Sequence, residues 1–237
     1  MCGRFTNQIT WRELVELYRI HDQPALNLRP RYNVAPSQDI PIVRLVEDRE
    51  DAPKDAEGDE REPEREIAIA RWGLVPFWAK DLKVGYKMIN AKAETVDEKP
   101  AFRAAFKARR CLIPADGFYE WKKLDQKEKQ PYRLCLADRR PFAFAGLWER
   151  NRDLDVTSCT IVTTDANEVA APIHDRMPVI LPPETWTAWL SPATPPAEAK
   201  ALLKPYAGAM VAYPVDNAVG SPKNDGPELI EEIEEES

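Results

Sequence analysis

The chain has 237 residues and a formal net charge of -7 at pH 7, with four cysteines and two histidines. A chain of this length can bury one substantial core, which fits a single domain or a small two-lobed one. It contains no apolar run of about 18 residues, and its first residues lack a basic stretch followed by an apolar one, so we expect no membrane span, no signal peptide and a cytoplasmic location.

The cysteines and histidines argue against a structural metal and against a disulfide framework. The cysteines are widely spaced, with no Cys-x-x-Cys pair and no nearby histidine: Cys2, Cys111, Cys135 and Cys159. This spacing suits free thiols in a reducing compartment. Since His21 and His174 are the only histidines, we expect no metal centre and no other cofactor.

The charge is unevenly distributed along the chain. Residues 47–66 carry a net charge of -7, and residues 225–237 carry another -7, so the remainder has 29 bases, 22 acids and a net charge of +7. Acidic runs of this kind are usually solvated and disordered. We therefore expect one domain over residues 1–224 with a disordered loop insertion at 47–66, followed by an acidic tail that acts as a spacer. The basic body permits a polyanionic partner.

The first part of the chain is predicted to contain one helix and a hairpin. Thr10 followed by Glu13 is a capping-box pattern, which predicts a helix over residues 11–20. The composition of residues 28–37, rich in proline, asparagine and arginine, indicates a loop. Apolar runs at residues 40–46 and 67–72 predict two strands that flank the acidic insertion.

The rest of the chain is predicted to be mostly strands with a few short helices. Turn-rich apolar runs predict strands at residues 111–113, 117–121, 132–136, 142–147, 158–163 and 210–215. Short helices are expected at residues 102–109, 183–190 and 196–204, the last two with proline at the start. The 22 prolines argue against long helices. The fold class expected is α+β, mainly antiparallel β.

Cys2 offers the most distinctive chemistry in the sequence. Removal of Met1, expected before a small residue, would leave Cys2 with a free α-amine and a thiol on adjacent carbons. Reference pKa values of about 7.7–8.0 for the amine and about 8.5 for the thiol leave both partly deprotonated near neutral pH. The amine can attack an aldehyde to form a Schiff base, and the thiolate can then close a five-membered thiazolidine ring on the same carbon.

The dipeptide alone leaves three other interpretations open. Cys2 can be an incidental small residue at a start site. Class II glutamine amidotransferases also begin with Met-Cys-Gly, where the amine serves as base and the thiol attacks an amide carbonyl. A Cys-His or Cys-His-Asn thiol protease is the third alternative.

Longer motifs along the chain favour one family. In order they are MCGRF, RYNVAPSQ, RWGLVPFWAKD, MINAKAETVDEKPAFR, CLIPADGFYEWKK, IVTTDANEVAAPIHDRMPVIL and VGSPKNDGPELI. Together they resemble the SRAP (SOS response-associated peptidase) family, whose members form covalent DNA–protein crosslinks at abasic sites in single-stranded DNA. The resemblance covers nearly the whole chain except the acidic insertion and the tail, and it implies a barrel-like SRAP fold with peripheral short helices.

The resemblance implies four catalytic residues. Cys2 matches the crosslinking residue, and Asn90 in MINAKAET matches the asparagine that positions the amine and the adduct. Glu120 in GFYEW matches the catalytic glutamate, and His174 in IHDRMP matches a histidine that assists proton transfer. A carboxyl group with a raised pKa suits the opening of a sugar hemiacetal. Each residue alone would be interpreted as structural or solvent-facing, and the matching motifs reverse that interpretation.

Seven further residues match family positions that contact DNA: Arg4, Pro36, Phe77, Trp78, Lys92, Thr163 and Arg176. Affinity for single strands needs cations on phosphates and flat surfaces beneath bases. Lys92 stands where many members carry arginine. A lysine keeps the positive charge but cannot form the two parallel hydrogen bonds that a guanidinium makes to a phosphate. Phe77 and Trp78 are expected to wedge or stack where the strand bends, although aromatic residues more often lie in the core.

The sequence thus favours a monomer that binds single-stranded DNA and captures abasic sites through a thiazolidine on Cys2, which is a lyase-type chemistry. The protein is expected to be associated with the nucleoid when it is bound to DNA. The alternative is a cysteine-type peptidase acting through Cys2, including self-processing that removes Met1. The amidotransferase interpretation weakens because no synthetase domain or matching downstream motif is present. A non-catalytic DNA-binding module would leave Cys2 unexplained.

Overall fold

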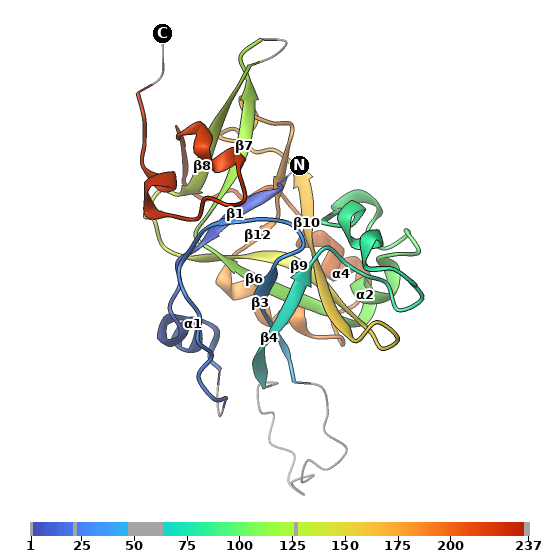
Figure 1. Cartoon of the computed structure of the whole chain (residues 1–237). Coiled ribbons are helices and arrows are strands. Elements are labelled where there is room, and N and C mark those ends of the chain that lie inside the picture. Colours follow the sequence, from blue (N-terminus) through green and yellow to red (C-terminus); the bar gives the residue numbers. More distant parts are fainter. Residues whose placement is uncertain (1, 21–22, 47–63, 126–127, 235–237) are drawn as a thin grey trace, which may run out of the picture.

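The computed structural model describes residues 2–20, 23–46, 64–125 and 128–234 of the chain (Figure 1). The predicted disorder of the acidic insertion falls mostly on residues 47–63, outside the described residues. Within the described ranges, no helix is both long enough and apolar enough to cross a membrane.

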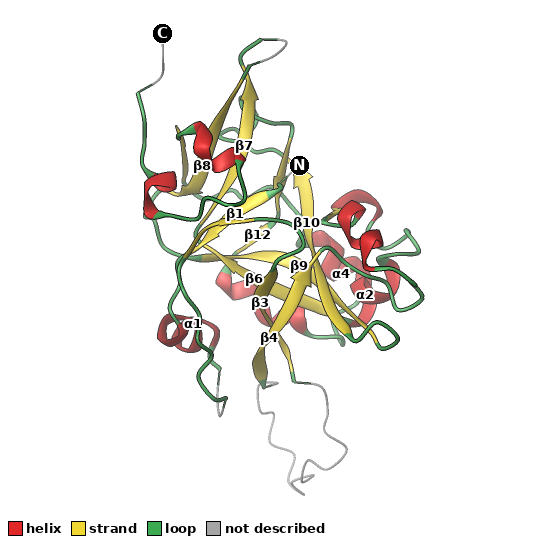
Figure 2. Cartoon of the chain, viewed as in Figure 1, coloured by secondary structure: helices red, strands yellow, loops and turns green. Residues whose placement is uncertain are grey.

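Strands dominate the structure, and the helices are short (Figure 2). The strands are β1 (Arg4–Asn7), β2 (Arg31–Val34), β3 (Asp39–Leu45), β4 (Arg65–Trp72), β5 (Asn90–Lys92), β6 (Arg110–Ala115), β7 (Gly117–Lys123), β8 (Lys129–Leu136), β9 (Phe142–Asn151), β10 (Val156–Asp165), β11 (Arg176–Pro178), β12 (Ile180–Leu181) and β13 (Met210–Pro214). The α-helices are α1 (Trp11–Tyr18), α2 (Arg103–Ala108), α3 (Trp186–Leu190) and α4 (Pro196–Ala201). Short 3-10 helices lie at Leu82–Lys87, Ala93–Thr95, Pro183–Thr185, Asn217–Gly220 and Pro227–Ile230.

One of the two sheets closes into a barrel. Its strand order is β11-β10-β4-β3-β6-β9-β12, and β9 also pairs with β10, which joins β10, β4, β3, β6 and β9 in a ring. The second sheet has the order β13-β8-β7-β1-β2 and is antiparallel throughout. The parallel pairings are β10 with β4 and β10 with β5. The expected α+β, mainly antiparallel and barrel-like fold is confirmed.

The apolar runs of the sequence become barrel strands because both of their faces are covered. Every residue of β6 is buried, and β9 is buried over most of its length, as expected for strands packed on two sides. One core cluster joins the barrel to α1 and α3, where Tyr18 stacks on Trp186 at a ring-centroid distance of 4.7 Å. A second cluster contains Cys2, Phe5 and Trp72, and a third contains Tyr119, Tyr213 and Leu229.

Several local predictions need correction. The loop predicted over residues 28–37 contains β2, which pairs with β1. Helix α1 ends at Tyr18 rather than at residue 20, because Arg19 adopts the left-handed conformation (φ 54°). Strand β4 begins at Arg65, so the acidic insertion ends before residue 66, and Glu66 accepts a hydrogen bond from Arg44 Nε at 2.7 Å.

The described part of the acidic tail is folded against the body. The Asp225 carboxylate accepts hydrogen bonds from the backbone N–H groups of Tyr32 (2.6 Å) and Asn33 (2.9 Å) and from Arg31 Nε (2.6 Å). Leu229, in the 3-10 helix Pro227–Ile230, is fully buried. The expectation of a disordered spacer is therefore wrong for residues 225–234: Asp225 and Pro227–Ile230 pack beside β2, and the Ile233 N–H donates to the Pro214 carbonyl of β13 at 3.1 Å.

Candidate active site and nucleic-acid interface

Strand pairing brings the amino-terminal end of the chain beside Glu120. Strand β1 pairs antiparallel with β7, with Arg4 opposite Tyr119 and Thr6 opposite Gly117. Because the two strands run in opposite directions, the chain before Arg4 continues toward Glu120. Glu120 is buried in the middle of β7.

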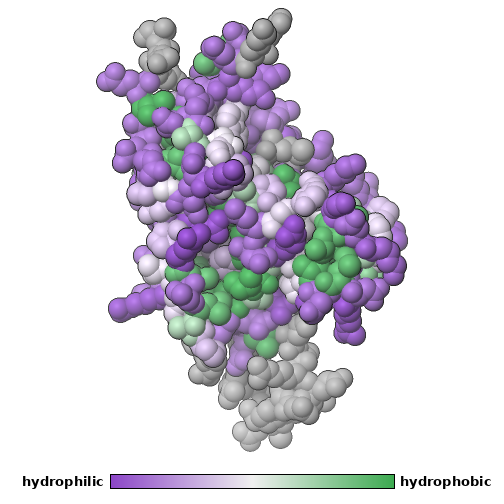
Figure 3. All heavy atoms as spheres, viewed as in Figure 1, coloured by the Kyte–Doolittle hydropathy of each residue, from purple (hydrophilic) through white to green (hydrophobic). Residues whose placement is uncertain are grey.

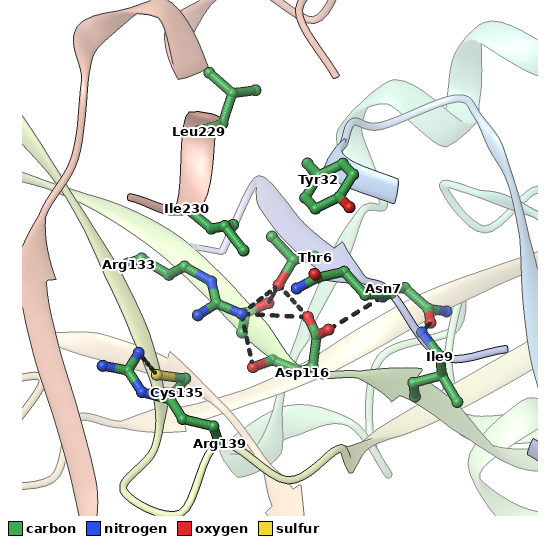
Figure 4. Close-up of polar contacts among 12 residues, drawn as sticks. Thr6, Asn7, Ile9, Tyr32, Asp116, Arg133, Cys135, Arg139, Leu229 and Ile230 are labelled. Carbon is green, nitrogen blue, oxygen red and sulfur yellow. Dashed lines mark hydrogen bonds and ion pairs between the residues drawn. The ribbon is translucent and has the colours of Figure 1, made fainter. Parts of the chain in front are cut away.

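A buried network fixes β1 in this position (Figure 4). Arg133 Nη2 on β8 donates to Thr6 Oγ1 at 3.2 Å and to Asp116 Oδ1 at 3.4 Å. Asp116 Oδ2 accepts from the backbone N–H of Gln8 at 3.1 Å. Arg133 Nη1 donates to the Tyr213 hydroxyl at 2.8 Å, which extends the network to β13. Since buried ionic groups are costly to leave unpaired, this network holds β1 against its neighbours.

Asn90 contacts the backbone of Cys2. The Asn90 Nδ2 group donates to the Cys2 carbonyl at 2.8 Å, although 88 positions separate the two residues. Asn90 Oδ1 is buried and has no hydrogen-bond partner within the described part of the chain. The Cys2 side chain is fully buried, and its thiol donates to the Arg4 carbonyl at 3.7 Å. Asn90 is therefore hydrogen-bonded to the Cys2 backbone, and its positioning role stays a prediction.

Trp72 holds the backbone next to Asn90. Its indole Nε1 donates to the carbonyl of Ile89 at 2.9 Å, directly before Asn90. The Trp72 ring also packs edge-to-face on Phe5 of β1, with ring centroids 5.2 Å apart. One buried side chain thus contacts both the strand that follows Cys2 and the segment that carries Asn90.

The ionisable groups of the site share the field of the amino terminus. Burial raises the pKa of Glu120 to about 7, and the amino-terminal charge opposes that shift. Burial and the negative charge of Glu120 raise the pKa of the Cys2 thiol, while the amino-terminal charge lowers it. Burial lowers the pKa of His174, and the amino-terminal charge lowers it further. The amino-terminal charge that acts on these three pKa values is that of Met1, not of a free amine at Cys2.

The His174 ring is held by its neighbours in the segment before β11. Its Nδ1 atom accepts a hydrogen bond from the backbone N–H of Arg176 at 3.0 Å and lies 2.9 Å from Asp175 Oδ1. The backbone N–H requires an unprotonated Nδ1, whereas the Asp175 carboxylate favours a protonated one, so these two contacts do not assign the proton to either ring nitrogen. The lowered pKa of His174 agrees with a neutral ring near pH 7.

Arg176 and Thr163 lie in a hydrogen-bonded cluster where β5, β10 and β11 meet. The Arg176 guanidinium binds both oxygens of Glu94 (2.7 and 3.0 Å), Asp165 Oδ1 (2.8 Å) and the Thr163 carbonyl (2.8 Å). The Thr163 side chain is buried, whereas Lys92, opposite Thr163 in the β5–β10 register, is exposed. Lys92 is thus available to a phosphate, while Arg176 would have to exchange a carboxylate for one. DNA contacts at all three residues stay predictions.

Arg4 also has protein partners. Its guanidinium donates to Asn33 Oδ1 (2.9 Å) and to the carbonyls of Val219 (2.8 Å) and Gly220 (3.0 Å), which ties β1 to the carboxyl-terminal segment. Burial lowers the Arg4 pKa. Pro36 is half-buried in the turn after β2. The predicted DNA contacts of Arg4 and Pro36 stay predictions.

Phe77 and Trp78 project from a tight turn and are not core residues. The Ala79 N–H donates to the Pro76 carbonyl at 2.9 Å, so Phe77 and Trp78 occupy the two central turn positions. The buried Asn151 amide donates to the carbonyls of Pro76 (2.8 Å) and Ala79 (3.0 Å). The aromatic side chains are 60% and 49% exposed, respectively. Exposed aromatic rings on a braced turn suit stacking against bases.

Comparison with known families agrees with this geometry. The family model described as "SOS response associated peptidase (SRAP)" matches residues 1–222. The chain belongs to the SRAP family. The match spans every residue named above as a candidate for catalysis or DNA contact.

Named relatives of this SRAP chain occur in bacteria and in vertebrates. It is 47% identical to the abasic site processing protein YoqW of Bacillus subtilis (strain 168), over 98% of this chain and 99% of that protein. It is 32% identical to the abasic site processing protein HMCES of Xenopus tropicalis, over 86% of this chain and 67% of that protein. A crystal structure of a protein from Bacteroides thetaiotaomicron aligns with a TM-score of 0.76 at 27% identity, covering 97% of this chain and 99% of that one.

Sequence reasoning missed the residues that support the SRAP site. Trp72 and Asn151 are not among the predicted catalytic or DNA-contacting residues. The side chain of each donates hydrogen bonds to backbone carbonyls of segments that carry such residues. Their signal in the sequence is weak, because a tryptophan at the end of an apolar run is an ordinary core residue. Among the described residues, no three His, Cys, Asp or Glu side chains are grouped so as to hold a metal ion.

Proposed function

We propose that this protein captures abasic sites in single-stranded DNA by forming a thiazolidine between Cys2 and the ring-opened sugar. The observation that carries the proposal is the placement of Cys2, whose carbonyl accepts from Asn90 Nδ2 at 2.8 Å and whose strand is paired so that the chain before Arg4 runs toward the buried Glu120. Glu120, with its raised pKa, and His174 are the acid–base groups that would serve a free amine and thiol at Cys2. The names of YoqW and HMCES as abasic site processing proteins support the same substrate.

The reaction would begin at the sugar. An abasic deoxyribose is mainly a closed hemiacetal, and only the open form presents an aldehyde. Glu120, with a pKa of about 7, is present in both protonated and ionised forms near neutral pH, so it can transfer a proton in either direction during ring opening. The neutral Cys2 amine then adds to the aldehyde carbon, and loss of water gives a Schiff base.

The thiol would act second. Burial and Glu120 keep the Cys2 thiol protonated at rest, so the amine is the stronger nucleophile at that stage. The positive charge of the protonated Schiff base favours ionisation of the adjacent thiol. Its proton passes to Glu120 or His174 as sulfur bonds to the former aldehyde carbon. The net reaction joins amine, thiol and aldehyde with the release of one water molecule.

The exposed turn and Lys92 would contact the strand. Phe77 and Trp78 offer flat surfaces to unpaired bases, and the exposed Lys92 offers a cation to the backbone. The site gives less support to a peptidase that cleaves other proteins, because a buried thiol with a raised pKa is a poor resting nucleophile. Self-processing that removes Met1 is compatible with this site.

The proposal is tested with a single-stranded oligonucleotide that carries one abasic site. The purified protein, with Met1 shown to be absent by intact mass, is expected to give a band that survives heat and SDS. The mass of that band should equal protein plus DNA minus one water. Cys2→Ala should give no stable band. Cys2→Ala and Cys2→Ser both keep the α-amine, so each should give a Schiff-base product that requires borohydride reduction to survive.

Two results would overturn the proposal. One is the absence of a heat-stable band with the wild-type protein when Met1 is missing. The other is an undiminished heat-stable band with Cys2→Ala, since the thiol would then not be needed for the stable bond. Cleavage of a peptide substrate that depends on Cys2, without any DNA adduct, would favour the peptidase alternative.

A further inference from the structure

A basic pocket opens beside His174, at the end of the β7–β8 hairpin. Its volume is about 410 Å³, and its lining includes three lysines, Lys122, Lys123 and Lys129, together with Trp121, His174 and Asp175. Figure 1 shows that the hairpin extends beyond the rest of the β-structure, while Figure 3 shows that hydrophilic residues cover most of the visible face. The lysines match no position that the sequence assigned to DNA contact.

Two of these lysines oppose each other across the hairpin. Lys123 and Lys129 are direct partners in the antiparallel register, and both are exposed. Side chains at such positions have Cβ atoms about 5 Å apart, where like charges are destabilising. Neither lysine forms an ion pair with any described residue. An anion between the two ammonium groups would turn this repulsion into attraction.

Lys122 connects the pocket to the catalytic strand. It lies two residues after Glu120 on β7, so both side chains leave the same face of the strand. At about 3.3 Å per residue, their Cα atoms are about 7 Å apart. The Lys122 ammonium lies 5.4 Å from the centre of the Tyr132 ring, and Tyr132 is opposite Glu120 in the register. An anion bound here would be a near neighbour of a molecule at Glu120.

We propose that this pocket binds backbone phosphates of the DNA strand that flanks the abasic nucleotide. The inference rests on the proposed function, because it takes the reacting sugar to lie at Cys2 and Glu120. Lysine ammonium groups bind phosphates as point charges, and Trp121 supplies a flat wall next to them. Asp175 is the one carboxylate of the lining, which leaves the pocket with a positive balance. Because side chains alternate along a strand, Lys122 leaves the Glu120 face of the hairpin and the Lys123–Lys129 pair leaves the other face, and successive phosphates of a strand that crosses the hairpin edge can reach both.

The pocket is tested through the salt dependence of non-covalent binding to an undamaged single-stranded oligonucleotide. Each phosphate contact adds about 0.7 to the slope of log K against log salt concentration. The variant K123Q/K129Q should therefore lower that slope by about 1.4, and Lys122→Gln should lower it by about 0.7. The matched control K107Q/K204Q removes two exposed lysines from other surfaces and should leave the slope unchanged. The Tm of K123Q/K129Q should not fall, because the repulsion is removed.

Three outcomes would overturn the inference. One is a slope for K123Q/K129Q equal to that of the wild type, and another is an equal loss in the K107Q/K204Q control. The third is competition by polyglutamate of matched charge that is as strong as competition by the oligonucleotide and depends equally on the lysines. That result would indicate that the pocket binds an acidic peptide. If the wild type forms no crosslink, the proposed function fails, and the salt slope on undamaged DNA still decides whether the pocket binds phosphates.

Discussion

Glu120 gives the sharpest prediction about stability, because burial raises its pKa from an ordinary value of 4.5 to about 7. In this interval the folded protein retains a proton that the unfolded chain releases. The unfolded state therefore binds fewer protons, and stability falls as pH rises from about 4.5 to 7. Glu120→Gln keeps the shape of the side chain and removes the ionisation. The variant should be more stable than the wild type above pH 7.

The expected size follows from the same pKa. At about 1.36 kcal/mol per pKa unit, moving the pKa from 4.5 to about 7 corresponds to a cost of about 3 kcal/mol at pH 8. Glu120 is only 4% exposed, so solvent screens little of this cost. For a protein of this size, about 3 kcal/mol raises Tm by roughly 6–12 °C. The advantage of the variant should disappear below pH 4.5, where Glu120 is protonated in both states.

The assay is urea unfolding of both proteins at intervals from pH 4 to pH 8. Glu168→Gln, at an exposed position, is the matched control and should show no such pH-dependent gain. The same Glu120→Gln protein should form the abasic-site crosslink at least about 100-fold more slowly, the usual contribution of a general acid–base group. A stability difference between Glu120→Gln and wild type that is constant across this pH range would refute the reasoning.

Three further predictions concern other parts of the site. Replacing Phe77 and Trp78 together by alanine should change stability by less than about 0.5 kcal/mol and weaken capture of abasic DNA by about 10-fold or more, as measured by thermal unfolding and gel shift. Asn90→Ala leaves the Cys2 carbonyl without its 2.8 Å donor and should slow crosslinking about 10-fold, as followed in a quenched time course. Asp225→Ala removes the acceptor of three N–H groups and should lower the free energy of unfolding in urea by about 2–3 kcal/mol. An unchanged urea midpoint would contradict a tail that is folded against the body.

The long strands could be predicted from the sequence, and the short ones could not. Strands β6 to β10 coincide with apolar runs, because these strands are largely buried on both faces, so composition alone identifies them. Strands β1, β2, β5, β11 and β12 have two to four residues each. Such segments are stabilised by pairing with distant strands, and β2 lies within residues 28–37, whose proline and arginine content indicated a loop. Their local sequence contains no signal of the partner that stabilises them.

The candidate site was identified by motif resemblance rather than by spacing. Asn90, Glu120 and His174 lie far from Cys2 in the sequence, and only strand pairing relates them in space. The resemblance could not show what each side chain contacts. Arg4 and Arg176 have the charge expected of phosphate ligands, yet both guanidinium groups already bind protein acceptors. Exposure of Phe77 and Trp78 likewise depends on a turn braced by Asn151, which is distant in the sequence.

The chemistry proposed for Cys2 places opposing demands on the fold. Burial of Glu120 raises its pKa into the useful range and at the same time lowers stability above pH 7. A reactive amine at a chain end would also fray unless its strand were anchored. The Arg133–Asp116–Thr6 network and the pairing of β1 with both β2 and β7 provide that anchor a few residues away. The fold thus places a buried ionic network, in which Arg133 binds Thr6, Asp116 and Tyr213, a few residues from Cys2, and this network anchors the strand that would present the reacting amine.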